Sequence, residues 1–254
     1  MDSTSLNITA SIVLHNEDFE QLKTTVQSFL AIPESKRLFL IDNGSNSNFE
    51  EAFSDPAIIY LRNERNVGFA RAHNQILSKV KGLSQFHLIL NPDIRFTSEV
   101  INQLIAQMKA NPSIGLSAPR VLYPSGELQY TARRYPTLFE VVYRRLGWFS
   151  KRIHRNEYRD QDLTQTFNPD FLHGCFLLFK TDDFVRINGF DERYFLYMED
   201  VDICRKLDEI EKKKLYYPHV EVTHIFKKAS AKKLPLLVIH LSSAIKYFKK
   251  WGFV

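Results

Sequence analysis

Short apolar runs alternate with helix-spaced apolar residues along the first half of the chain. Continuous apolar runs of this kind predict buried strands, here at residues 8–14, 38–41, 58–61 and 86–90. Apolar residues spaced three and four positions apart predict helices, here at residues 19–30, about 68–80 and about 98–110. Strands that alternate with helices are typical of a mostly parallel sheet with helices on both faces. The first half therefore predicts an α/β fold, in which ligands bind at the carboxyl ends of the strands.

The second half of the chain has a less regular pattern. Its apolar residues predict strands at 171–179 and 215–222, and helices at 138–149, from about 200, and at 234–251. Residues 123–126 and 188–191 have the composition of turns, and the charged, aperiodic segment 151–168 is expected to be a mobile loop. No internal repeat, low-complexity segment or clear linker interrupts the sequence. We therefore expect a single domain over residues 1–254.

Composition narrows the class of protein only moderately. Of the 254 residues, 44% are hydrophobic and 25% are charged, which is ordinary for a soluble globular protein with a substantial core. The net charge of +5 suits a nucleic acid, an anionic lipid or a phosphorylated ligand, and it equally suits simple solubility. Cys175 and Cys204 have no neighbour at metal-ligand spacing, so they are expected to be reduced core residues rather than zinc ligands. With no signal peptide and no apolar stretch of about 18 residues, we expect a cytoplasmic protein.

Polar side chains follow the first, second and fourth predicted strands, namely His15, Asn16, Asp42, Asn43, Ser45, Asn91 and Asp93. Asp42 could accept hydrogen bonds from a base or a ribose, although an Asp-Asn-Gly turn also bonds its own backbone. Asp93 could hold a divalent metal together with phosphate oxygens and water. The alternative for Asp93 is an ordinary Asn-Pro-Asp turn before a helix.

The segment 66–74, NVGFARAHN, is expected to open a helix. Gly68 allows a ligand to approach the free N–H groups of the helix start, and Arg71 could reach a phosphate. The alternative is a helix start capped by Asn66. The sequence contains neither GxGxxG after the first strand nor GxxxxGK[ST], which disfavours a dinucleotide oxidoreductase and a P-loop enzyme.

Three acidic residues and one histidine in the second half of the chain are candidates for a general base and a metal ligand. Glu199, Asp200 and Asp202 lie at a predicted helix start, where the helix dipole favours the ionised carboxylate that a general base needs. Favourable charge in a first helical turn is the alternative. His224 follows a strand and could bind a metal beside Lys227 and its neighbouring lysine, although a partly buried histidine would fit the same pattern.

The ordered motifs IDNGS, NVGFARAHN, LNPDI, HGCFLLFK and GFDERYFLYMEDVDICRKL, followed by a late histidine, closely resemble the family 2 inverting glycosyltransferases. Within that family they look most like the rhamnosyltransferase-like branch that builds bacterial cell-surface polysaccharides. The resemblance covers about residues 8–250, and the combination of LNPD with GFDERYFLYMEDVD is its most specific part. It implies a GT-A-type fold with a nucleotide-binding half (about 1–110), an acceptor and catalytic half (about 111–233) and a C-terminal amphipathic helix (about 234–254).

The resemblance also implies a role for each matching position. Asp200 would be the general base, with Glu199 beside it, and Asp93 and His224 would hold Mg²⁺ or Mn²⁺ against the donor diphosphate. The nucleotide-sugar donor would contact Asp42 for its nucleoside, and the full donor-binding set is His15, Asn16, Asp42, Asn43, Ser45, Asn66, Gly68, Arg71, Asn74, Asn91, His173, Gly174 and Lys227. Two positions depart from the family pattern. Asn91 replaces the first acid of the metal motif, and the segment after His224 lacks a glycine-rich loop, for which Lys227 could compensate.

The branch suggests dTDP-L-rhamnose as donor, with a UDP-hexose or UDP-N-acetylhexosamine as the alternative, and a lipid-linked or other saccharide acceptor. A non-catalytic nucleotide-sugar or nucleic-acid binding module is the competing class. Because the aromatic residues lie in apolar runs rather than on a basic groove, we expect no nucleic acid. The apolar and basic segments 138–155 and 234–251 are typical of interfacial helices, which predicts peripheral binding at the inner membrane face. A core helix or a homodimer interface is the alternative for these segments.

Overall fold

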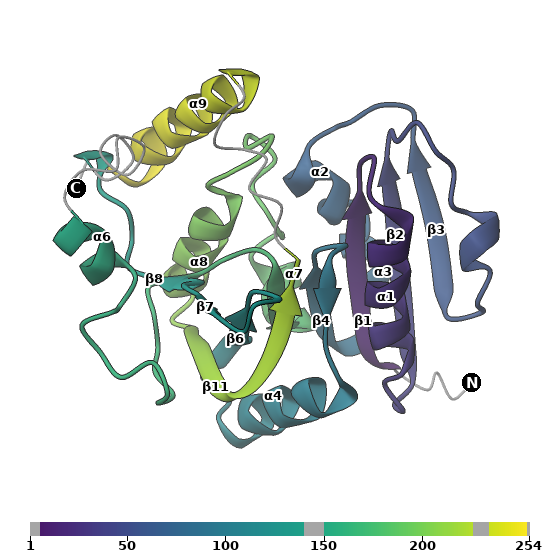
Figure 1. The fold of residues 1–254 in the computed structure, drawn as a ribbon, viewed down its shortest axis with the longest axis horizontal. Helices are drawn as coiled ribbons and strands as arrows, with labels where there is room; N and C mark the ends of the chain where they lie inside the picture. The colour runs from purple at the N-terminus through teal and green to yellow at the C-terminus, as the bar shows by residue number, and fades with distance from the viewer. Residues whose placement is uncertain (1–5, 140–149, 226–233, 253–254) are drawn as a thin grey trace.

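A computed structural model describes residues 6–139, 150–225 and 234–252 (Figure 1). Its main element is a nine-stranded sheet in the order β3-β2-β1-β4-β10-β6-β11-β5, with β7 beside β6. Strands β1 (Leu6–Leu14), β2 (Lys36–Asn43), β3 (Ile58–Asn63) and β4 (Ser84–Leu90) are all parallel. The parallel strands predicted for the first half are therefore confirmed, and their carboxyl ends lie at one edge of the sheet.

The second half of the chain continues the same sheet through β10 (Phe176–Lys180), which runs antiparallel to both β4 and β6 (Ile114–Leu122). Strand β11 (Lys213–His224) pairs with β6 in parallel. The short strands β5 (Ile94–Arg95) and β7 (Leu128–Gln129) are antiparallel additions. The sheet is thus mixed rather than uniformly parallel, and no break in it separates the two halves of the chain.

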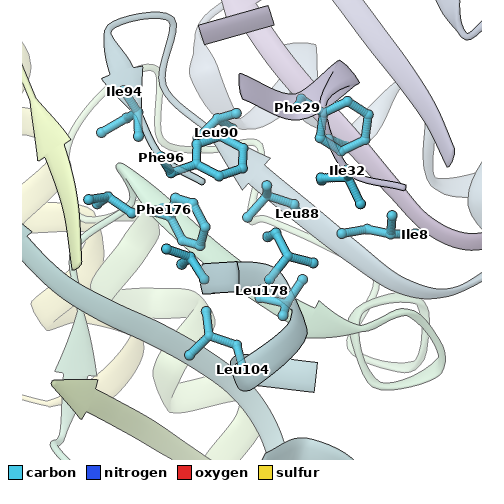
Figure 2. Packing of buried hydrophobic residues seen from close by; sticks show 14 of the residues in the cluster. Ile8, Phe29, Ile32, Leu88, Leu90, Ile94, Phe96, Leu104, Phe176 and Leu178 are labelled. Carbon is cyan, nitrogen blue, oxygen red and sulfur yellow. The ribbon is translucent and has the colours of Figure 1, made fainter. Parts of the chain in front are cut away.

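Helices cover both faces of the sheet, as the alternating pattern predicted. On one face lie α1 (Phe19–Leu30) and α4 (Ser98–Ala110), whose side chains Phe29 and Leu104 join Ile8, Leu88 and Leu178 of the strands (Figure 2). The opposite face carries α2 (Phe69–Asn74), α3 (Leu77–Val80), α7 (Thr181–Arg186), α8 (Glu199–Glu209) and α9 (Leu234–Trp251). Burial of apolar side chains on both faces explains why the strands are continuous apolar runs in the sequence.

Three predicted elements differ in the structure. Residues 171–179 form two strands, β9 (Phe171–Leu172) and β10, because the chain leaves a small sheet with β8 (Ala132–Arg133) before it enters the large one. The helix predicted over 68–80 is divided into α2 and α3.

The segment 151–168, expected to be a mobile loop, is the third difference. It begins with α6 (Ser150–Asn156), whose last residue bonds Arg134 through both its backbone and its side chain. Its charges are also paired, since the buried carboxylate of Glu157 contacts Arg133 at 3.4 Å and Arg159 at 2.6 Å. These ion pairs hold the segment 151–168 against the rest of the protein, although its sequence shows no periodicity.

Part of the chain lies outside the described residues. Most of the helix predicted over 138–149 falls there, as does Lys227. Among the described residues, the chain between β2 and β3 also contains the 3₁₀ helix η1 (Glu51–Phe53). In the three described stretches, no helix combines the length and the apolar character needed to cross a membrane.

Candidate active site

The ends of β1 and β2 are joined by hydrogen bonds between neighbouring polar residues. His15 Nδ1 donates to the Asn43 carbonyl at 3.2 Å, and the Asn16 N–H donates to Ser45 Oγ at 3.1 Å. Asn16 adopts a left-handed conformation (φ 60°), which asparagine tolerates better than most residues. Parallel pairing places these residues side by side, so the structure brings together the donor-binding set predicted at these two strand ends.

Asp42 is fully buried at the end of β2. Its Oδ1 accepts from the Ser45 N–H at 2.8 Å, and its Oδ2 accepts from Tyr60 Oη at 3.0 Å. Arg62 Nε lies 3.6 Å from the same Oδ2. These are the contacts of a self-bonded turn, the alternative for this motif, and a direct contact between Asp42 and a nucleoside stays a prediction.

Asn43 connects β2 to the chain that leads into α2. Its Nδ2 donates to Asn66 Oδ1 at 2.9 Å, and its Oδ1 accepts from the Val67 N–H at 3.0 Å. Gly68 follows with φ 91°, and a Cβ added there would lie 2.7 Å from the Phe195 carbonyl oxygen. The close approach of residue 195 therefore requires glycine at position 68. This contact links the chain before α2 to the segment before α8.

Arg71 and Asn74, both predicted to bind the donor, instead contact the turn at 188–192. Asn74 Nδ2 donates to the Phe190 carbonyl at 2.8 Å, and its Oδ1 accepts from the Phe190 N–H at 2.9 Å. Arg71 Nε donates to Glu192 at 3.0 Å, with both side chains exposed. No hydrogen bond or ion pair among the described residues joins the side chains of Arg71 and Asn74 to the strand-end cluster, and their roles in binding donor remain predictions.

Asp93 and His224 meet where β5 pairs with the end of β11. His224 Nε2 lies 3.2 Å from Asp93 Oδ1, and His224 Nδ1 donates to Gln129 Oε1 at 2.9 Å. Burial lowers the pKa of His224, but its hydrogen bonds to Asp93 and Cys175 outweigh burial and raise the pKa to about 10. Since Gln129 occupies Nδ1, the coordinating position of a neutral His224 is the Nε2 that faces Asp93.

A divalent ion fits this pair. Asp93 Oδ1 is buried and, apart from His224, has no hydrogen-bond partner among the described residues, as expected of an oxygen kept for a cation. A carboxylate oxygen and an imidazole nitrogen are both ligands of Mn²⁺, and oxygen also suits Mg²⁺. The described residues contain no cluster of three or more acidic, histidine or cysteine ligands, so a bound substrate would complete the shell. Asn91, also predicted to bind the donor, donates its backbone N–H to the Cys175 carbonyl at 2.9 Å, which extends the pairing of β4 with β10.

Asp200 lies in the first turn of α8, beside the break between β9 and β10. Its Oδ2 accepts from the Gly174 N–H at 3.3 Å, and its Oδ1 accepts from the Val201 N–H at 2.9 Å. His173 Nδ1 lies 3.6 Å from Oδ2. Burial raises the pKa of Asp200, against the two backbone donors, while 16% of its side chain stays exposed. The structure thus brings His173, Gly174 and Asp200 together, with a carboxylate side chain within reach of solvent.

Glu199 precedes Asp200 and is more deeply buried. Burial, and next the neighbouring charge of Asp200, raise the pKa of Glu199, which disfavours its ionised form. The two residues before it, Tyr197 and Met198, both have φ 69°. Left-handed non-glycine residues cost roughly 1–3 kcal/mol each and cluster at functional sites.

Sequence reasoning missed several residues of this site. Gln129 orients His224, Tyr60 bonds Asp42, and the positive charge of Arg133 opposes the rise in the pKa of Asp200. All three are far from their partners in the sequence, and none belongs to a recognisable motif. Asp202, the third acid at this helix start, turns away from Asp200 and bonds the last turn of α9.

A model of the family described as Glycosyl transferase family 2 matches residues 9–187. The chain belongs to glycosyl transferase family 2. This confirms the resemblance seen in the motifs and identifies the protein as a glycosyltransferase. The match ends before Glu199 and Asp200, so it says nothing of the residues proposed for the chemistry.

Curated relatives of this glycosyltransferase include two rhamnosyltransferases. It is 29% identical over 209 residues to the N-acetylglucosaminyl-diphospho-decaprenol L-rhamnosyltransferase of Mycobacterium tuberculosis, covering 77% of this chain and 68% of the relative. It is 24% identical over 222 residues to the rhamnosyltransferase WbbL of Escherichia coli K12, covering 84% of this chain and 81% of the relative. The predicted rhamnosyltransferase-like branch is therefore confirmed.

Among solved structures, the glycosyltransferase resembles the crystal structure of GalNAc-T7 with UDP, GalNAc and Mn²⁺. The TM-score is 0.67 at 19% identity, and the likeness covers 99% of this chain. The chain spans about half, 51%, of the GalNAc-T7 chain. At this identity the likeness shows the fold alone, and it confirms the GT-A type.

Proposed function

We propose that this glycosyltransferase transfers one sugar, with inversion, from a nucleoside diphosphate to an acceptor hydroxyl, and that Asp200 is the general base. In a single in-line displacement, the acceptor oxygen bonds the anomeric carbon, and the diphosphate leaves with the electron pair of its bond to that carbon. The acceptor proton passes to a carboxylate oxygen of Asp200. The observation that carries the proposal is a partly exposed carboxylate, oriented by Gly174 and Val201, at the same edge of the sheet as the Asp93–His224 pair.

Asp93 and His224 would hold Mg²⁺ or Mn²⁺ with oxygens of the donor diphosphate. When bound, the ion would neutralise charge that develops on the leaving diphosphate. Support comes from the buried Asp93 oxygen, whose one polar partner among the described residues is His224, from the orientation that Gln129 gives His224, and from the Mn²⁺ in the GalNAc-T7 complex. Asn91 offers an amide in place of a carboxylate, so this motif supplies one negative charge to the ion rather than two.

The proposed donor is dTDP-L-rhamnose, because the relatives from Mycobacterium tuberculosis and Escherichia coli are both named rhamnosyltransferases. The alternative is a UDP-hexose or UDP-N-acetylhexosamine, which the UDP and GalNAc in the GalNAc-T7 structure favour. Thermal unfolding with a panel of nucleotide sugars and Mg²⁺ separates the two. A tightly bound donor raises the melting temperature by mass action, by an amount that grows with ligand concentration. We expect the largest rise with dTDP-rhamnose, and a rise with UDP-sugars alone would contradict this choice of donor.

We further propose a lipid-linked acceptor that is met at an anionic membrane surface. The Mycobacterium tuberculosis relative is named for a decaprenol-linked substrate. On α9, the exposed apolar residues Val238, Leu241 and Ile245 recur at helical spacing and form an outward stripe. Interfacial helices bury such a stripe at the headgroup boundary.

We limit the proposed surface to the part of α9 before Tyr247. Tyr247 and Phe248, expected to contact lipid, are buried, and the ammonium groups of Lys246 and Lys250 bond other parts of the protein. A truncation that removes residues 249–254 would be a poor test of membrane binding, because it would also remove the internal hydrogen bonds of Lys250 and Trp251 to Asp202. Replacing Val238, Leu241 and Ile245 together by serine should abolish sedimentation with anionic liposomes and leave turnover of a water-soluble acceptor unchanged. Undiminished sedimentation would contradict the proposal.

A further inference from the structure

Helix α9 lies beside the segment that leads into α8 and contacts it from successive turns (Figure 1). Ser243 Oγ donates to the Leu196 carbonyl at 2.8 Å. One turn earlier, the His240 ring contacts the Tyr197 ring, with centroids 5.1 Å apart. Residues three apart on a helix share a face. One face of α9 therefore holds the backbone immediately before Glu199 and Asp200.

The same helix ends at a buried carboxylate. Asp202 has no exposed surface, and its Oδ1 accepts from Lys250 Nζ at 2.8 Å and from Trp251 Nε1 at 2.7 Å. Its Oδ2 accepts from Lys250 at 3.0 Å, and Tyr194 Oη adds a donor to Oδ1 at 3.1 Å. A buried carboxylate needs such partners, because removing one leaves an uncompensated charge. The last turn of α9 thus fixes the first turn of α8.

Asp202 and Asp200 point to different sides of that turn. Two residues along an α-helix correspond to a rotation of about 200°. Holding Asp202 against α9 therefore directs Asp200 away from α9, toward the Gly174 N–H that bonds it at 3.3 Å. Since the turn is one rigid unit, its rotation sets the direction of both carboxylates.

The chain between these two anchors is strained. Tyr197 and Met198 are consecutive non-glycine residues with φ 69°. Such conformations persist only where the surroundings hold them. Ser243 bonds the residue before the pair, and Lys250 and Trp251 bond Asp202 after it. Helix α9 thus supplies a restraint on each side of the strained pair, in addition to the hydrogen bond from the Phe69 N–H to the Phe195 carbonyl at 2.9 Å.

We propose that α9 acts as a clamp that positions Asp200, and that Ser243, Lys250 and Asp202 are positioning residues for the transfer step. The proposal rests on the proposed function, because it takes Asp200 as the base. It concerns residues beyond the stretch that the family model matches. A small rotation of the first turn of α8 would move the base off the line of the acceptor proton, and misplacements of about 1 Å from distant substitutions can cost about 100-fold in rate.

The test compares two adjacent serines. Ser243→Ala removes the bond to the Leu196 carbonyl, whereas Ser242→Ala makes the same change at an exposed position of the same helix. We expect Ser243→Ala to lower kcat about tenfold and Lys250→Met about 100-fold, with the donor Kd within about twofold of the wild type. Lys250→Arg, which keeps the charge and the donors, should recover most of kcat, and Ser242→Ala should match the wild type. Ser243→Ala removes one hydrogen bond only, so the test holds even where Lys250→Met does not fold.

Ile105→Val, in the core on the opposite face of the sheet, controls for loss of stability alone. The clamp is supported when Ser243→Ala loses more kcat than Ile105→Val at an equal or smaller fall in melting temperature. It is overturned when Ser243→Ala and Lys250→Met keep kcat within about twofold while Asp200→Asn is inactive, a result that leaves the base assignment standing. Near-normal turnover of Asp200→Asn would instead overturn the base, and the clamp with it.

Discussion

The ends of β1 and β2, where we propose that the donor binds, and the segment around Asp200 are built in different ways. At the ends of β1 and β2, polar residues bond one another across neighbouring parallel strands, as His15 does with Asn43. Around Asp200, the backbone is irregular and strained, and its partners come from the chain before β10 and from α9. The sheet register alone can set the first region, whereas the second requires contacts between segments distant in sequence. Substitutions in the first region should therefore change mainly donor affinity, and substitutions in the second region should change mainly turnover.

Asp200→Asn is expected to have the largest effect. The amide cannot accept the acceptor proton, so turnover should fall by about 1,000-fold or more while donor affinity stays nearly unchanged. Steady-state kinetics and calorimetric titration of the donor measure the two quantities separately. Asp182→Asn, at an exposed position in the first turn of α7, is the matched control and should retain full activity. Near-normal turnover of Asp200→Asn would remove Asp200 as the base.

Asp93→Asn should act on the donor side and have the next largest effect. It replaces the carboxylate beside His224, so donor affinity in the presence of Mg²⁺ or Mn²⁺ should fall about 10- to 100-fold. Asn91→Ala should weaken donor binding less, and chelation with EDTA should weaken wild-type binding as Asp93→Asn does. Unchanged binding and turnover in EDTA would mean that cationic side chains such as Arg71 or Lys227 neutralise the diphosphate.

Two glycines allow the junction between the regions to be tested through stability. Gly68→Ala would place a Cβ 2.7 Å from the Phe195 carbonyl oxygen at φ 91°, and should lower the free energy of unfolding by about 2 kcal/mol or more. Gly174→Ala would place its Cβ 3.6 Å from the Asp200 Cβ, an ordinary contact, and should cost about 1 kcal/mol or less. Urea denaturation measures both. Equal costs would show that the two loops do not meet as closely as the structure has them.

The smallest expected effect is on the pH dependence of stability, and it comes from two buried histidines that contact β1. His87 contacts the hydroxyls of Thr9 and Ser11 at 2.8 and 3.0 Å, and Ser11 contacts His73 at 2.8 Å. Burial lowers the pKa of His87 to about 3, and burial also lowers the pKa of His73. Both imidazoles are therefore neutral in the folded protein at pH 7.

The folded state of these histidines binds a proton less readily than the unfolded state, whose pKa is about 6.5. Their contribution to stability is therefore complete above about pH 6.5 and is lost as pH falls below that value. For His87, the free energy of unfolding should fall by about 1.5 kcal/mol between pH 6.5 and pH 5. His87→Gln should be less stable at pH 7 and should lose less stability on acidification. An equal slope in wild type and variant would contradict this source of acid sensitivity.

Elements with strong apolar periodicity were predictable from the sequence. Helices 19–30, 98–110 and 234–251 begin and end where the pattern indicated, because each has one buried face. The strand-end polar residues were also placed together correctly, since parallel strands align their carboxyl ends. The break at residues 173–175 could not be predicted from the pattern, because the apolar run resumes directly after it and the hydrogen bond from the Gly174 N–H to Asp200 joins segments that are distant in the sequence.

Side-chain contacts between residues distant in the sequence were equally unpredictable. Lys250 has the sequence context of a solvated or lipid-facing lysine, yet its ammonium bonds the buried Asp202. Arg71 has the context of a phosphate ligand but bonds Glu192. A charged side chain carries no local signal of its partner, so its partner is known only once the distant segments have been placed in space.

The place of β10 in the sheet has a consequence for how the chain folds. β10 lies between β4 and β6, although both of its neighbours precede it in the sequence. Until residues 176–180 are in place, β4 presents an unpaired edge, and open edges of this kind template association between chains. Pairing across such sequence separations is slow, because loop entropy is lost before the contact forms. We therefore expect the centre of the sheet to form late in folding, and the edge of β4 to be open to association between chains until it does.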